Sequence, residues 1–153
     1  MKRSILCLLT AVFTAFAMQG YSAEEHSTEE HSHGHQSHGA ATALPGLSLN
    51  NGERWQTDDH TRMLSQTMRK TFFAADHTTL EGLNSAGTLM GQQVQELIAG
   101  CTMTGAAHDQ LHLFLNQHIP TINALKAATD YSVARDNAIL LKGQLETYRK
   151  HFQ

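Results

Sequence analysis

Apolar residues recur in alternating steps of three and four from about residue 57 to the end of the chain, which is the spacing of one helix face. Short polar segments divide this pattern into four stretches. Thr57 or Asp58, Thr104 and Asp130 stand where helix N-cap residues are expected. The predicted helices cover residues 58–75, 79–101, 105–127 and 130–151.

Each stretch has its own predicted buried face. The stripes expected to be buried are His60, Leu64, Met68, Thr71 and Ala75; Leu83, Gly87, Met90, Val94, Leu97 and Cys101; His108, Leu111, His112, Leu115, Ile119 and Ile122; and Ala134, Ala138, Leu141, Leu145, Tyr148 and Phe152. Four amphipathic helices with short connections predict an all-α, antiparallel up-down-up-down four-helix bundle over residues 47–153. A short lead-in precedes the bundle, with a turn at Asn51-Gly52.

The first residues of the chain have the pattern of an export signal. Lys2 and Arg3 precede a thirteen-residue apolar run over residues 5–17, and small residues follow it. This is the pattern of a secretory signal peptide, here over residues 1–23. The run is too short for a transmembrane helix, which needs ~20 residues. We therefore expect a periplasmic protein with no membrane attachment after cleavage.

We predict that residues 24–46 form a disordered linker, because they are rich in His, Ser, Gly and Glu and show no apolar periodicity. Five of the 11 histidines lie here: His26, His31, His33, His35 and His38. Two interpretations stay open: weak metal capture by clustered imidazoles, or a soluble spacer.

Charge and cysteine usage narrow the choice of partner. The net charge is −3, and loss of Lys2 and Arg3 with the signal peptide brings it to −5. Nucleic acid and anionic lipid both require a basic surface, so neither is expected. Cys101 becomes the only cysteine, and in an oxidising compartment it needs an explanation: an intermolecular disulfide, a buried thiol or a metal thiolate.

The strongest chemical signal is a cluster of soft and imidazole donors between the second and third predicted helices. Cys101, Met103, His108 and His112 supply a thiol, a thioether and two imidazoles, and the two histidines share one helix face. Antiparallel topology brings His60 and His151 to the same pole. This donor set predicts a metal site, with copper favoured over zinc because a thioether is a soft ligand.

The segment Cys101-x-Met103-x-Gly105-x-x-His108-Asp109-x-Leu111-His112 resembles a set of small exported bacterial proteins of unestablished function. The lead-in Leu49-Asn50-Asn51-Gly52-x-x-Trp55 resembles the same set, and together the similarity covers about residues 47–126. The resemblance implies an exported helical domain and supplies no reaction.

Three functions remain in view. The first is a periplasmic metal-binding protein for storage, buffering or delivery to a partner protein. The second is a b-type haem protein that uses Met63 and His151 as axial ligands. The third is a cofactor-free structural or interaction module. No Ser-His-Asp or paired-carboxylate arrangement stands out. Cys101 with His108 is the only nucleophile–base pairing, and cysteine enzymes are uncommon in the periplasm, so we do not expect an enzyme.

Overall fold

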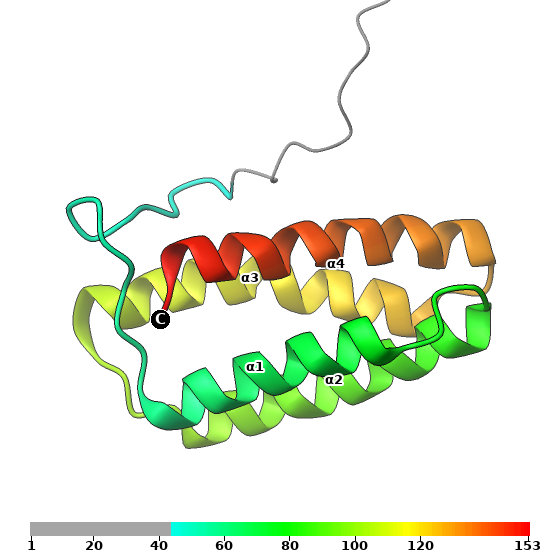
Figure 1. The fold of residues 1–153 in the computed structure, drawn as a ribbon, viewed down its shortest axis with the longest axis horizontal. Coiled ribbons are helices and arrows are strands. Elements are labelled where there is room, and N and C mark those ends of the chain that lie inside the picture. The colour runs from blue at the N-terminus through cyan, green and yellow to red at the C-terminus, as the bar shows by residue number, and fades with distance from the viewer. Residues whose placement is uncertain (1–43) are drawn as a thin grey trace, which may run out of the picture. The chain divides into compact units, whose positions relative to one another are not determined.

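The computed structural model describes residues 44–153, so the predicted signal peptide and most of the predicted His-rich linker lie outside the described residues. Four antiparallel helices form an up-down bundle (Figure 1). They are α1 (Asp59–Ala74), α2 (Leu80–Gly100), α3 (Gly105–Ala127) and α4 (Tyr131–His151). The predicted boundaries are confirmed to within one residue. None of the helices in this part of the chain is long and apolar enough to cross a bilayer.

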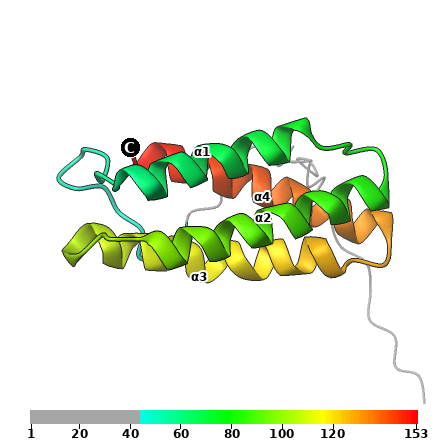
Figure 2. The same ribbon diagram turned by 90° about the horizontal axis from the view of Figure 1, so that it is seen from below.

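The helices pack mainly in chain order. α1 packs along α2, α2 along α3 and α3 along α4, while α2 and α4 approach each other less extensively across the bundle. Figure 2 shows the α2–α3 pair side by side along its length. α1 and α4, which would close the ring, make no comparable contact. The bundle is therefore loosest between its first and last helices.

Side-chain caps explain where three of the helices begin. The Asp58 carboxylate accepts a hydrogen bond from the Thr61 amide at 2.7 Å, and the Asp130 carboxylate accepts one from the Ser132 amide at 2.8 Å. The α2 cap is formed by the hydroxyl of Thr79. Each cap satisfies an amide that has no partner within the helix. Thr104 stands at the N-cap of α3 but its side chain makes no such bond.

The lead-in closes one end of the bundle. Asn51 and Gly52 have φ angles of 52° and 90°, and Asn50 and Glu53 exchange two backbone hydrogen bonds around them. This confirms the predicted turn. The Trp55 amide then donates to the His151 carbonyl at 2.7 Å, which ties the lead-in to the end of α4. Leu44, inside the predicted linker, is already buried in the core.

Two of the four predicted buried faces are wrong in part. The stripes on α2 and α4 are confirmed, except that Cys101 and Tyr148 are only half-buried. On α3 the buried residues are Leu111, Phe114, Leu115, His118, Ile122 and Leu125. On α1 they are Thr61, Leu64, Ser65, Met68 and Phe72. His112 is exposed and His60 half-buried, because the helices present slightly rotated faces to their neighbours.

Candidate functional site

The predicted donors lie at one end of the bundle. α1 begins there, α2 ends there, α3 begins there, and α4 returns to it (Figure 1). This shared pole follows from the antiparallel topology predicted from the sequence. The surroundings of the individual donor side chains differ, and by these surroundings the donors divide into three groups.

His108 and His112 form the first group. Their Nε2 atoms are 3.1 Å apart, and the ring centroids are 4.4 Å apart with the planes nearly perpendicular. His108 is half-buried and His112 is exposed, so the pair faces solvent on the first turns of α3. Successive helical turns place the rings on one face. Two imidazole nitrogens thus converge at an accessible point.

Cys101 and Met103 form the second group and pack against the hydrophobic core. Cys101 follows α2 directly and is a free, half-buried cysteine. In residues 44–153 no three His, Cys, Asp or Glu side chains lie close enough together to hold one metal ion. The part of the predicted cluster that the structure brings together is therefore the histidine pair.

His60 and His151 form the third group, and each is held by a backbone carbonyl. The His60 Nε2–H donates to the Glu96 carbonyl at 2.9 Å, and its ring occupies the space where a side chain at Gly100 would lie. His60 therefore links α1 to α2. His151 donates from Nδ1 to the Thr147 carbonyl at 2.9 Å, so that nitrogen is engaged within α4.

The connection between α2 and α3 is anchored by Asp58. Its Oδ2 atom accepts hydrogen bonds from the amide and hydroxyl of Thr102 at 2.6 and 2.8 Å. Burial would raise the pKa of Asp58, but the hydrogen bonds from Thr102 and Thr61 outweigh burial and hold the pKa well below its usual range. The N-cap of α1 thus also fixes the residue between Cys101 and Met103.

The predicted haem ligand Met63 does not face the bundle interior. Its side chain is 57 % exposed on α1. An axial ligand in a four-helix haem protein projects into the core between helices. The position of Met63 therefore gives no support to a buried haem between α1 and α4.

The sequence analysis did not select a histidine that lies buried between α3 and α4. His118 on α3 is fully buried, and its Nδ1 lies 2.8 Å from the Gln144 side-chain oxygen on α4. Burial lowers its pKa to about 4, although the Gln144 hydrogen bond acts in the opposite direction. The sequence signal was its spacing from Phe114 and Ile122, which places all three on one face.

Comparisons of the chain with protein-family models, with characterised proteins and with solved structures found no match. The resemblance to small exported bacterial proteins stays a prediction.

Proposed function

We propose that this chain is an exported, periplasmic metal-binding protein whose accessible site is the His108–His112 pair. The observation that supports this most is the 3.1 Å separation of the two Nε2 atoms. Metal–imidazole bonds are ~2.0–2.1 Å long, so two nitrogens on one ion lie ~3 Å apart when the angle at the metal is near a right angle. The separation in the pair is 3.1 Å, which matches this geometry.

Copper is the preferred ion. Among divalent first-row metals, copper forms the most stable complexes with imidazole ligands. Met103 and Cys101 add soft donors within the same connection, and these suit copper in its reduced state. Their participation requires the 101–104 connection to turn them from the core toward the histidines.

The exposure of the pair favours exchange over long-term storage. Two protein ligands leave positions on the ion open to water, to a further donor or to a partner protein. His112 is exposed and His108 half-buried, so an incoming ligand can reach the ion. Buffering and delivery to a partner protein therefore fit this geometry better than permanent sequestration.

The proposal is tested by metal titration of the purified, tag-free protein. Copper affinity should fall on the order of tenfold or more in His108→Ala and in His112→Ala, and the double variant should lose little more, because one nitrogen alone cannot chelate. His77→Gln removes an imidazole from the opposite pole and is the matched control. Cys101→Ser tests separately whether the thiol joins the site with reduced copper.

Two outcomes would contradict the proposed copper site. If both α3 variants bind copper as tightly as His77→Gln while elemental analysis finds bound copper, the ion sits elsewhere. If the purified protein takes up no copper beyond that of the double variant, the pair is a hydrogen-bonded surface feature and the proposed function is wrong.

A further inference from the structure

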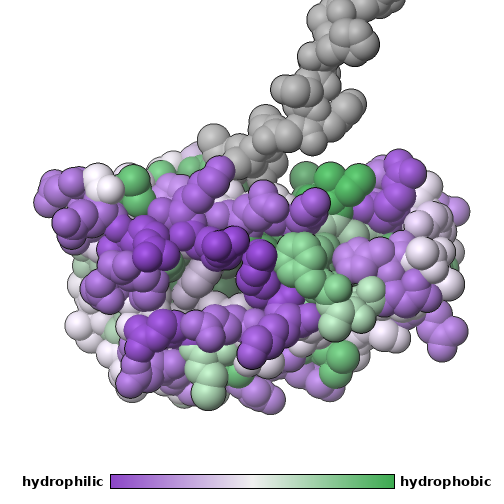
Figure 3. Space-filling model, in the orientation of Figure 1, coloured by the Kyte–Doolittle hydropathy of each residue, from purple (hydrophilic) through white to green (hydrophobic). Residues whose placement is uncertain are grey.

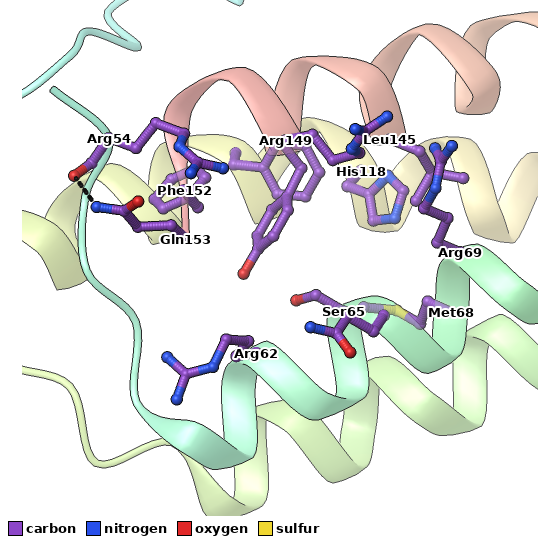
Figure 4. A pocket seen from close by; sticks show the side chains of 13 residues that line it. Arg54, Arg62, Ser65, Met68, Arg69, His118, Leu145, Arg149, Phe152 and Gln153 are labelled. Atoms are coloured by element: carbon purple, nitrogen blue, oxygen red, sulfur yellow. Dashed lines mark hydrogen bonds between the residues drawn. The ribbon is translucent and has the colours of Figure 1, made fainter. Parts of the chain in front are cut away.

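A second site is suggested by a cavity of about 500 Å³ between α1 and α4, which pack together less closely than the helix pairs that follow each other in the chain. α3 forms its floor, and the C-terminal residues close one end. Figure 4 shows side chains from both helices directed into this space. Small-molecule sites in proteins typically measure ~300–1,000 Å³. The cavity is therefore large enough for a ligand.

The lining is strongly basic in a protein whose net charge is −3. No Asp or Glu side chain lines the cavity, and its four charged side chains are all arginines: Arg54, Arg62, Arg69 and Arg149. Of these, only Arg62 forms an ion pair within residues 44–153, with Asp59. Figure 3 shows strongly hydrophilic residues over the half of this face where α1 begins and α4 ends. The other three guanidinium groups form no ion pair among the described residues, and such unpaired guanidinium groups favour an anionic ligand.

Arg69 is held in place for such a role. Its guanidinium lies over the ring of Phe73, 4.5 Å from the ring centroid, which restricts its motion. Its Nη1 atom is buried and has no hydrogen-bond partner. A buried charged donor without an acceptor costs free energy, and an anion in the cavity would supply the acceptor.

His118 presents an unpaired acceptor to the same cavity. The Gln144 amide nitrogen donates to the Thr121 hydroxyl at 2.9 Å, so the Gln144 oxygen is the atom that faces His118. The proton of His118 therefore sits on Nδ1, and Nε2 has a free lone pair. That Nε2 atom is buried and has no partner. It can accept a hydrogen bond from a ligand hydroxyl or from a water that accompanies the ligand.

Tyr148 on α4 also lines the cavity. The pKa of Tyr148 is raised, because burial outweighs the opposite effect of the nearby Ser65 and Thr57 hydroxyls. The Tyr148 hydroxyl has no hydrogen-bond partner in the described residues. The phenol therefore stays a protonated donor. The apolar part of the lining lies behind these polar groups and consists of Met68, Phe114, Leu145 and Phe152.

We propose that the cavity between α1 and α4 binds a small organic acid, whose carboxylate meets the arginines and whose apolar body lies on the α3–α4 floor. Arg69 and Arg149 flank the anionic end, and Tyr148 donates to it. His118 accepts a hydrogen bond deeper in the cavity. An inorganic anion would satisfy the arginines but would leave the apolar floor in contact with water, and a neutral lipid would leave the guanidinium groups unpaired.

Calorimetric titration of the purified protein at neutral pH tests this site with three probes. Octanoate has both a carboxylate and an apolar chain, 1-octanol has the chain without the charge, and sulfate has the charge without the chain. We expect saturable octanoate binding that is tighter than that of either other probe. Arg69→Gln and Arg149→Gln should each weaken octanoate binding ~10- to 100-fold, as expected for a charge-assisted hydrogen bond.

Arg135→Gln is the matched control, because Arg135 lies on α4 outside this cavity and its loss changes the net charge equally. It should leave octanoate binding unchanged. Arg149 is exposed, so its variant is expected to fold even if Arg69→Gln does not. The proposal is overturned if octanoate fails to bind, if sulfate or 1-octanol binds equally tightly, or if the Arg149 and Arg135 variants behave alike.

Discussion

At the scale of single residues, His118 shows how burial fixes a protonation state. The desolvated imidazole is neutral at neutral pH, since its pKa lies near 4 instead of 6.5. Its proton is directed to Gln144, whose own amide is fixed by α3. The arrangement leaves the other ring nitrogen, Nε2, buried without a hydrogen-bond partner. A polar core residue here favours one register of α3 against α4 and contributes to the proposed ligand site.

The protonation state of His118 gives a pH-dependent prediction. A pKa lowered to about 4 in the folded state means that the unfolded chain binds the proton first as pH falls below 6.5. The folded state should therefore lose stability between pH 6.5 and 4, by about 3 kcal/mol in total. His118→Leu removes this titration. Its free energy of unfolding should be lower at pH 7.5, because Gln144 loses a partner, but should vary less over that pH range.

Urea unfolding at a series of pH values provides the measurement. The slope of stability against pH should be shallower in His118→Leu than in the natural chain. An identical slope in both proteins would show that another group titrates in this range.

At the scale of helices, close packing of α2 on α3 depends on the absence of a side chain. A Cβ atom at Gly87 would lie 2.7 Å from the backbone nitrogen of Lys126 and 3.0 Å from its Cα. Backbone atoms cannot move aside as a flexible side chain does. Gly91, one helical turn further along α2, faces only a methyl group of Ile122 at 3.8 Å from the same hypothetical atom.

The two glycines form a matched pair for mutation. Gly87→Ala should destabilise the protein by about 1–3 kcal/mol, because the added methyl forces α2 and α3 apart. Gly91→Ala should be neutral or stabilising by up to about 1 kcal/mol, since alanine favours the helix and the methyl has room. Thermal unfolding followed by circular dichroism measures both. Equal effects at the two positions would contradict the close approach at Gly87.

The helices themselves were predictable because their signals are local. Capping residues such as Asp58 and Asp130 mark where a helix begins, and the spacing of three and four residues shows that the segment is helical. Neither signal depends on distant parts of the chain. Local signals did not determine which face of α3 is buried. Apolar residues cover a broad arc of that helix, so spacing alone allowed either His112 or His118 to face inward. The partner Gln144, 26 residues away, decides in favour of His118.

At the scale of the whole molecule, topology could be predicted and side-chain convergence could not. The antiparallel order correctly placed His60, Cys101, His108 and His151 at one pole. Whether those side chains meet depends on rotations of a few tens of degrees about each helix. Only the pair on a single helix, His108 and His112, is independent of such rotations, and it is the pair that the structure brings together. The arginine-lined cavity depends on which two helices separate, and no local pattern reports that.

The division between bundle and N-terminal segment leads to the final prediction. Deletion of residues 24–39 should leave the melting temperature and the proposed copper site unchanged, because the core seen in residues 44–153 already includes Leu44 and is built from residues outside the deletion. It should lower the number of weakly bound ions by removing five histidines. A deletion extended through residue 46 removes Leu44 and should lower the melting temperature. Circular dichroism and equilibrium dialysis against copper distinguish these outcomes. Loss of all copper binding in the shorter deletion would place the site in the N-terminal histidines and not in the bundle.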